Sequence, residues 1–325
     1  MATSTDADPE AYFAAGYAAV RANVERVLSG KPHAVRMALT CLFAGGHLLV
    51  EDVPGVGKTS LAKAVAASID ASWHRIQFTP DLLPTDITGT TIYDQQSGAF
   101  GFRPGPVFSH IVLADEINRA SPKTQSALLE VMEERQVTMD GRAHPVPRPF
   151  LVVATQNPID LQGTYRLPEA QLDRFLLRIA VGYPDLAAER DLIMGRTRNG
   201  APPEVRPVAT IEQIRWMIEY VSRIYVGDAV AEYVARIAEA TRTAPQLRLG
   251  LSPRGSLALV RTAQAWAAGE GRAFVTPDDV KAVAEAVLAH RLMLAAQSEI
   301  DGLSTAGVVD EILSRVTVPV PAGTR

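Results

Sequence analysis

The sequence predicts an α/β domain with a mostly parallel sheet, followed by a domain built from helices. In the first 185 residues, short apolar runs alternate with longer segments, several of them helical, a pattern typical of strands buried on both faces of a parallel sheet. Beyond about residue 185 the strand pattern stops and helical periodicity continues to the C-terminal region. The five predicted strands are residues 47–50, 73–78, 111–113, 150–154 and 176–181.

The predicted helices follow from apolar spacing and from capping residues. Apolar residues three and four apart predict a helix over 10–29, and a second helix is expected over 33–43. Ser121 is a good N-cap, and Pro122 suits the first position of the amphipathic helix that follows it. The helices predicted for the second domain are residues 211–225, 229–242, 254–268 and 277–294.

Two inserted hairpins interrupt the alternation of strand and helix. The first joins strand-like runs at 90–93 and 99–102, and the second lies within 136–146, where an Asp-Gly pair at 140–141 is a strong turn signal. Later in the chain, residues 198–207 contain one glycine and three prolines and are typical of a linker. The predicted division is an N-terminal helical segment at 1–30, an α/β core at 31–185, a linker at 186–207 and a helical domain at 208–325.

The composition excludes several classes of protein. The 325 residues carry 32 basic and 36 acidic side chains, a formal charge of −4, so the chain lacks the basic footprint of nucleic-acid binders. The longest apolar stretch, residues 37–50, is too short to cross a bilayer. The polar, acidic start differs from a secretory signal, and the single Cys41 cannot form an internal disulfide. We therefore expect a cytoplasmic protein without membrane insertion or bound nucleic acid.

The strongest chemical signal is the loop after the first predicted strand, with the sequence VEDVPGVGKTS at 50–60. Backbone N–H groups at a helix N-terminus bind anions, Lys58 can reach the outer phosphates of a nucleotide, and the Thr59 hydroxyl can join a Mg²⁺ shell. Asp52 stands where the usual motif has its first glycine. The residues expected to hold ATP in this loop are Pro54, Gly55, Val56, Gly57, Lys58, Thr59 and Ser60.

A second signal is the pair of carboxylates that ends the predicted strand at 111–113. Asp115 is positioned to hold Mg²⁺ together with Thr59, and Glu116 is positioned to polarise the water that attacks the γ-phosphate. Following a phosphate-binding loop, this pair favours nucleotide hydrolysis over simple binding. ATP and Mg²⁺ are the expected cofactors, and Thr59 and Asp115 are the expected metal ligands.

Three further residues fit nucleotide chemistry less specifically. The Asn157 amide follows an apolar strand and can sense the γ-phosphate or hold the attacking water, although a turn at Asn157-Pro158 explains it equally well. Arg174 and Arg254 can neutralise charge on a transferring phosphoryl group, but single arginines are more often surface ion-pair partners. If Arg174 lies at the far end of the domain, it needs a second subunit to reach a phosphate.

Taken together, the motifs resemble those of the MoxR group of AAA+ ATPases, from about residue 25 to about 295. Related helix-2-insert ATPases, such as magnesium-chelatase subunits and MCM helicases, share the architecture but not these motif sequences. The runs that carry the resemblance are EDVPGVGKT, FTPDLLPTDITG at 78–89, ADEINRASPKTQSALLEVMEERQVT at 114–138, ATQNP at 154–158 and LPEAQLDRF at 167–175.

The resemblance implies a P-loop core with sheet order 5-1-4-3-2, an all-helical lid, and a homo-oligomeric ring, taken as a hexamer, with each nucleotide between neighbours. By the same resemblance, the first hairpin corresponds to the helix-2 insert and the second to the pre-sensor-1 insert, and both face the ring centre. Asn157 matches sensor 1, Arg174 the arginine finger offered to the neighbour's ATP, and Arg254 sensor 2, which acts on either its own or a neighbouring nucleotide. Walker A comprises Gly55, Gly57, Lys58 and Thr59, and Walker B comprises Asp115 and Glu116.

Three functions are compatible with these motifs. The resemblance favours an ATP-driven chaperone that remodels or matures client proteins, including metal or cofactor insertion, with a partner that carries a von Willebrand factor A domain. The first alternative is a nucleic-acid motor related to MCM-type helicases, but residues 90–103 carry only Asp94 and Arg103 as charges, too few to hold a phosphate backbone. The second is an ATP-controlled assembly switch, which ranks lower because each element expected for hydrolysis is present.

Overall fold

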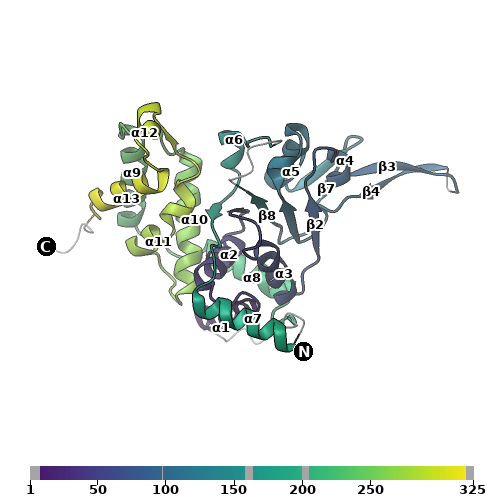
Figure 1. The fold of residues 1–325 in the computed structure, drawn as a ribbon, viewed down its shortest axis with the longest axis horizontal. Coiled ribbons are helices and arrows are strands. Elements are labelled where there is room, and N and C mark those ends of the chain that lie inside the picture. Colours follow the sequence, from purple (N-terminus) through teal and green to yellow (C-terminus); the bar gives the residue numbers. More distant parts are fainter. Residues whose placement is uncertain (1–7, 97, 158–163, 200–204, 320–325) are drawn as a thin grey trace.

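The centre of the protein (Figure 1) is a parallel sheet. It has five strands in the order β2-β5-β8-β1-β9. The computed structural model describes residues 8–96, 98–157, 164–199 and 205–319. Counted along the chain and read from β9, the strands have the order 5-1-4-3-2, so the predicted α/β class and strand order are confirmed. The strands are β1 (Leu48–Glu51), β2 (Trp73–Gln77), β5 (Ile111–Asp115), β8 (Leu151–Gln156) and β9 (Leu177–Ile179).

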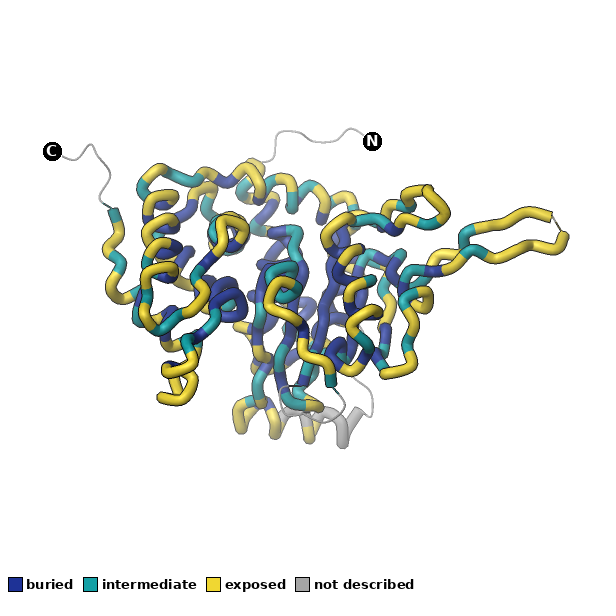
Figure 2. The backbone as a smooth tube through the Cα atoms, turned by 90° about the horizontal axis from the view of Figure 1, so that it is seen from above, coloured by how far each residue is buried: buried dark blue, intermediate teal, exposed yellow. Residues whose placement is uncertain are grey.

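Both faces of the sheet are buried at its three inner strands, β1, β5 and β8, which explains their continuous apolar runs (Figure 2). Successive side chains along a strand point to opposite faces. Leu48 and Val50 therefore pack in one hydrophobic cluster with helices α1, α2 and α3, whereas Leu49 packs in a second cluster with α5. The helices are α1 (Pro9–Glu25), α2 (Pro32–Phe43), α3 (Lys58–Ser68), α4 (Pro84–Thr88), α5 (Pro122–Glu134) and α6 (Glu169–Leu172), with a 3₁₀ turn at Ile117–Arg119.

Both predicted hairpins are confirmed. The β3–β4 hairpin projects away from the body of the protein, and the β6–β7 hairpin lies beside its base (Figures 1 and 2). The Thr91 hydroxyl donates to the Asp140 carboxylate at 2.5 Å, and the Phe102 ring stacks on His144 at 4.2 Å, so the two hairpins are joined by side chains. The strands are β3 (Gly89–Asp94), β4 (Ala99–Pro104), β6 (Gln136–Met139) and β7 (Arg142–Pro145).

The C-terminal region is mainly helical, with two corrections to the prediction. A two-stranded antiparallel sheet, β10 (Leu247–Leu249) with β11 (Met293–Leu294), means that this region is not all-helical. The helix predicted over 277–294 ends at Leu288, because the chain turns there to bury Arg291 and to pair β11. None of the helices in the described ranges is long and apolar enough to cross a lipid bilayer. The helices are α8 (Ile211–Ser222), α9 (Asp228–Thr243), α10 (Pro253–Gly269), α11 (Pro277–Leu288), α12 (Ala296–Ile300) and α13 (Thr305–Arg315).

The segment predicted as a linker, 186–207, begins as a helix, α7 (Leu186–Asn199). Asp185 caps this helix, because its carboxylate accepts a hydrogen bond from the Ala188 N–H at 2.7 Å. The proline-rich signal that suggested a linker comes later, and residues 200–204 lie outside the described ranges. Residues 186–199 of the predicted linker are thus helical, and the linker assignment itself stays a prediction.

The first and last helices share one hydrophobic core with the sheet. The Phe13 ring of α1 packs 5.4 Å from Phe43 of α2 and 5.3 Å from Tyr220 of α8. The Arg36 guanidinium of α2 lies 3.4 Å from the ring centre of Trp266 on α10. These buried contacts run across the predicted domain boundaries. The boundaries themselves stay a prediction.

His47 ties the start of β1 to two neighbouring elements. Its Nδ1 accepts a hydrogen bond from the Val152 N–H at 3.0 Å, and its Nε2 lies 3.1 Å from the Met132 carbonyl oxygen. Since Nδ1 is an acceptor, Nε2 carries the proton and donates it to that carbonyl. Burial, reinforced by the charge of Arg135, lowers the pKa of His47 to about 3. The ring is therefore neutral in the folded protein at physiological pH.

This buried imidazole predicts an acid-sensitive fold. The pKa of His47 is lower in the folded than in the unfolded state, so its contribution to stability is complete above pH 6.5 and is lost progressively as the pH falls toward 3. Between pH 7 and pH 5 the free energy of unfolding should fall by about 2 kcal/mol from this residue alone. Urea unfolding of the wild type and of His47→Asn at both pH values measures it. An equal pH dependence in the two proteins would contradict the assignment.

Candidate nucleotide site

The loop between β1 and α3 has the geometry of an anion-binding site. Gly57 is the N-cap of α3 and has a left-handed backbone with φ 102°, and Gly55 has φ 87°. Residues with a side chain rarely adopt such φ values, which explains why glycine occupies both positions. The loop leads directly into the helix at Lys58, so free N–H groups of the first turn lie at its end. The predicted residues from Pro54 to Ser60 thus form one continuous loop and helix start.

Asp52, the departure from the usual motif, anchors the start of this loop. Its Oδ2 accepts hydrogen bonds from the Val181 N–H at 2.8 Å and the Gly182 N–H at 2.6 Å, just beyond β9. Its Oδ1 accepts from the Val53 N–H at 2.7 Å. The aspartate therefore fixes the phosphate-binding loop to the chain that follows the edge strand.

Lys58 faces the carboxylates that close the site. Its ammonium group donates to the Asp52 carbonyl oxygen at 2.6 Å. Partial burial lowers the pKa of Lys58, and the negative charges of Asp52, Asp115 and Glu116 oppose that shift. The lysine thus lies between the loop and the predicted pair of acidic residues.

Thr155 of β8 orients both members of the acidic pair. Its hydroxyl donates to Oδ1 of Asp115 at 2.5 Å and accepts from the Glu116 N–H at 2.9 Å. Glu116 has a left-handed backbone, with φ 58° and ψ 48°, which is uncommon for a residue other than glycine. The strand therefore ends abruptly, with both carboxylates held at the carboxyl edge of the sheet.

Two side chains of β2 contact the same carboxylates, and the sequence did not reveal them. The Arg75 guanidinium donates to Oδ2 of Asp115 from Nε at 3.0 Å and from Nη2 at 2.7 Å. Gln77 donates from Nε2 to Glu116 at 2.8 Å. In the sequence these residues are only the polar positions of a short strand, and their neighbour β5 lies more than thirty residues away. The one signal was their two-residue spacing, which places both on one face.

Asn157 lies directly after β8 and is 8% exposed, at the same edge of the sheet as Asp115. The preceding Gln156 donates to the Glu51 carboxylate at 2.7 Å, and Glu51 ends β1. The predicted amide is therefore near the loop and the acidic pair. Pro158, which completes its motif, lies outside the described residues.

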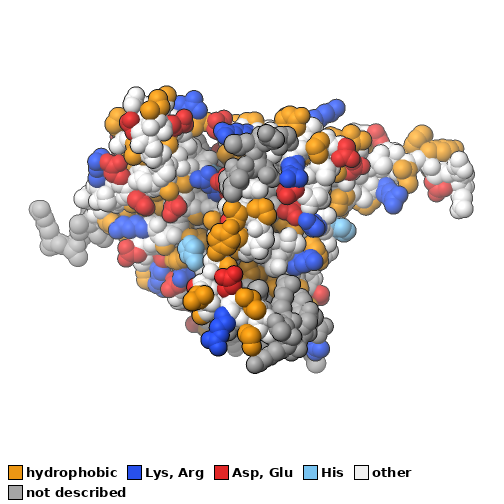
Figure 3. Space-filling view, viewed as in Figure 1, with side chains coloured by type: hydrophobic (Ala, Val, Ile, Leu, Met, Phe, Trp, Pro, Cys, Tyr) orange, Lys and Arg blue, Asp and Glu red, His pale blue; other side chains and the backbone are white. Residues whose placement is uncertain are grey.

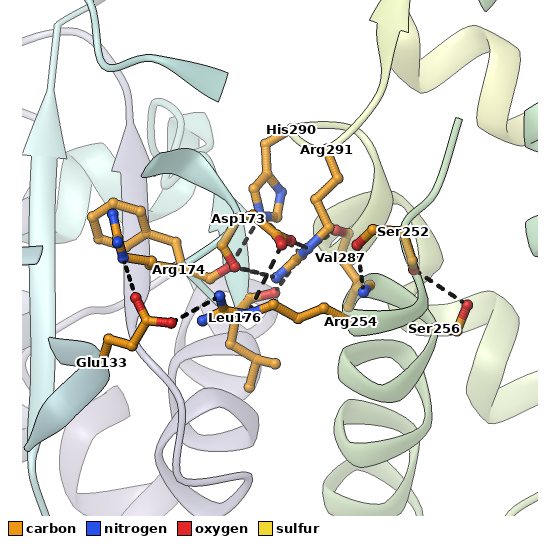
Figure 4. A network of polar contacts seen from close by, with 12 residues as sticks. Glu133, Asp173, Arg174, Leu176, Ser252, Arg254, Ser256, Val287, His290 and Arg291 are labelled. Carbon is orange, nitrogen blue, oxygen red and sulfur yellow. Dashed lines mark hydrogen bonds and ion pairs between the residues drawn. The ribbon is translucent and has the colours of Figure 1, made fainter. Parts of the chain in front are cut away.

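The two predicted arginines are brought together, but in a different place (Figure 4). The carboxylate of Glu133, near the end of α5, accepts from Nε of Arg174 at 2.7 Å and from Nη1 of Arg254 at 3.2 Å. Asp173 adds a second carboxylate, 3.8 Å from Arg254 and 2.7 Å from the buried Arg291. Arg291 also donates to the carbonyl oxygens of Phe175 and Leu176. The network joins α5, the chain before β9, and helices α10 and α11.

This network lies at the amino edge of the sheet. Arg174 precedes β9, and the nearby Leu176 N–H donates to the carbonyl of His47, the residue before β1, at 2.7 Å. Arg135, at the end of α5, donates to the carbonyl of Gly45 at 2.7 Å. Lys58, by contrast, follows the carboxyl end of β1. A five-residue strand spans roughly 16 Å, so the arginines are separated from their own phosphate-binding loop by the length of the sheet.

The carboxyl edge has the groups that a Mg²⁺–nucleotide needs. Magnesium prefers hard oxygen ligands and few protein side chains, which fits the Thr59 hydroxyl and the Asp115 carboxylate. Backbone N–H groups and Lys58 suit the phosphates. Glu116 is a further carboxylate at this edge, and a carboxylate held there can accept a proton from water.

Comparisons with known proteins agree with this geometry. Residues 47–177 match the model of the ATPase family associated with various cellular activities (AAA), and residues 239–312 match the AAA lid domain. The chain is 47% identical over 298 residues to protein YeaC of Bacillus subtilis, with 92% of this chain and 93% of that protein covered. It is 44% identical over 307 residues to chaperone MoxR1 of Mycobacterium tuberculosis, covering 91% and 80%.

A solved structure is similar over nearly the whole chain. The crystal structure of a putative ATPase from Cytophaga hutchinsonii superposes with a TM-score of 0.89 at 37% identity, covering 96% of this chain and 97% of that one. The likeness includes the sheet and the C-terminal helices, because so little of either chain is left uncovered.

The anchoring role of Asp52 predicts a measurable loss of stability. Asp52→Ala removes the acceptor for the buried N–H groups beyond β9, and the free energy of unfolding should fall by about 2–3 kcal/mol. Asp52→Asn keeps one acceptor oxygen and should lose less. Urea unfolding of the three proteins measures the series. An Asp52→Ala variant as stable as the wild type would contradict the anchor.

Proposed function

Because the chain belongs to the MoxR family of AAA+ ATPases, we propose that it uses ATP hydrolysis as a chaperone that remodels or matures client proteins. The similarity to chaperone MoxR1 supports this, since the alignment covers most of both chains. In this proposal the protein works as a homo-oligomeric ring, taken as a hexamer. ATP and Mg²⁺ are its cofactors.

The proposed roles at the carboxyl edge follow from the contacts described above. The N–H groups from Gly55 to Ser60, with Pro54 and Val56 shaping the loop, hold the phosphates, and Lys58 neutralises the outer ones. Thr59 and Asp115 hold Mg²⁺, which stabilises charge on the transferring phosphoryl group. Glu116 accepts the proton of the attacking water, and the Asn157 amide holds that water or the γ-phosphate.

The single observation that carries the ring proposal is the separation of the arginines from the loop. Arg174 and Arg254 share the Glu133 carboxylate at the amino edge of the sheet, so neither can reach the phosphates held at Lys58 of the same chain. Both can serve a nucleotide only if a neighbouring subunit presents it to that edge. We therefore assign both arginines to the neighbour's ATP, where they neutralise transition-state charge.

The hairpins support a protein client. The β3–β4 hairpin exposes Ile92, Tyr93 and Phe100, with the two rings 5.1 Å apart, and hydrophobic side chains lie along its outer part (Figure 3). Its few charges suit neither DNA nor RNA. A partner with a von Willebrand factor A domain, and insertion of a metal or cofactor into the client, extend the proposal from the family resemblance. DNA that stimulates turnover at physiological salt would favour the helicase alternative instead.

Glu116 is the proposed proton acceptor. Glu116→Gln should lower ATP turnover by about 100-fold or more, because the amide cannot accept the proton of the attacking water. Binding of an ATP analogue should stay within a few-fold of the wild type, since Lys58 and the loop are intact. Steady-state phosphate release and equilibrium binding measure the two effects. Unchanged turnover with unchanged binding would exclude Glu116 as the base.

The proposed ATP site is shared between two neighbouring subunits. Arg174→Ala subunits keep an intact loop and Glu116, and Glu116→Gln subunits keep an intact Arg174. Each variant alone should be nearly inactive, whereas a mixture should regain turnover at interfaces that combine the intact halves. Arg254→Ala should behave like Arg174→Ala in the same mixture. If mixing restores no turnover although the subunits co-assemble, the arginines act within their own chain.

A further inference from the structure

Asp115 already has a cationic partner within the chain. Its Oδ1 accepts from Thr155 at 2.5 Å, and its Oδ2 accepts from both Nε and Nη2 of Arg75 at 3.0 and 2.7 Å. Both carboxylate oxygens are therefore engaged by protein groups. This pairing is unexpected for a residue that is also proposed to hold a metal ion, because two cations then require the same carboxylate.

The exposure of the two side chains shows which one can move. The Asp115 side chain is 11% exposed and is fixed by Thr155, whereas the Arg75 side chain is 48% exposed on the edge strand β2. Because the guanidinium is half exposed, water hydrates it when it leaves, and breaking this pair costs less than breaking a fully buried one. The carboxylate stays in place when it does.

We propose that Arg75 is a positioning residue that serves as the internal counter-ion of Asp115 and competes with Mg²⁺ for it. The inference rests on the proposed function, in which Asp115 holds the metal. Without Mg²⁺–ATP, the guanidinium neutralises Asp115 beside the buried end of β5. When the metal binds, Arg75 moves from Oδ2 toward solvent.

The same arginine connects Asp115 to Glu116. Its Nη2 also donates to Oε1 of Gln77 at 2.7 Å, and Nε2 of Gln77 donates to Oε2 of Glu116 at 2.8 Å. Once the guanidinium leaves Asp115, Gln77 loses the contact that orients its amide. The hydrogen bond from Gln77 to Glu116 then weakens, while Arg119 keeps its ion pair with the same Glu116 oxygen at 3.3 Å.

The test is the Mg²⁺ dependence of nucleotide binding, which needs no turnover. A fluorescent, non-hydrolysable ATP analogue is bound to the full chain while Mg²⁺ is titrated. In Arg75→Ala the half-saturating Mg²⁺ concentration should fall by about three- to fivefold, as expected for removal of a half-exposed competing ion pair. Arg75→Lys retains the charge and should stay closer to the wild type. A merely structural role would weaken binding rather than strengthen it.

A matched control and a second variant separate the possible failures. Arg21→Ala removes a similar ion pair, Arg21 with Glu25 at 2.8 Å on α1, and should leave the Mg²⁺ dependence unchanged. Asp115→Asn should raise the half-saturating concentration strongly. If it does so while Arg75→Ala gives a wild-type or higher value, the counter-ion proposal is wrong. If Asp115→Asn leaves the Mg²⁺ dependence unchanged, the metal role of Asp115 fails first.

Discussion

All five strands of the central sheet run in the same direction, and the arrangement of the charged groups depends on this constraint. Every strand then ends at one edge, where the loop before α3, the acidic pair after β5 and the amide after β8 meet. Every strand begins at the other edge, where α5 returns and Glu133 gathers the arginines. In the proposed ring, the carboxyl edge of one chain and the amino edge of another together supply the groups for phosphoryl transfer.

The two edges also differ in how tightly their charges are held. At the amino edge, Arg291 is almost fully buried, and its guanidinium donates to the Asp173 carboxylate and to backbone carbonyls that include those of Leu176 and Val287. These contacts fix the start of β9 to the end of α11. Burial lowers the pKa of Arg291, and Asp173 opposes that shift. At the carboxyl edge, Arg75 is an exposed residue and Gln77 a half-buried residue of an edge strand. A rigid support for the arginines and an exchangeable one for the carboxylates suit their proposed roles.

Much of the fold could be predicted because its signals are local. Glycines mark the loop before α3, an Asp-Gly pair marks the second hairpin, and apolar runs mark strands buried on both faces. The missed features depend on contacts between distant segments. Arg75 meets Asp115 only because β2 and β5 are neighbours, and Arg291 ends its helix early only because the core offers it carbonyl partners. The α7 helix was missed because prolines further along dominated the pattern of that segment.

In the proposed ring, the amino edge of a neighbouring subunit completes each ATP site. The most direct measurement is an experimental structure of the assembled protein with Mg²⁺ and a non-hydrolysable ATP analogue. We expect the guanidinium groups of Arg174 and Arg254 to lie within hydrogen-bonding distance of the γ-phosphate bound to an adjacent chain, with Lys58 of that chain on the opposite side. A γ-phosphate contacted by Arg174 or Arg254 of its own chain would contradict it.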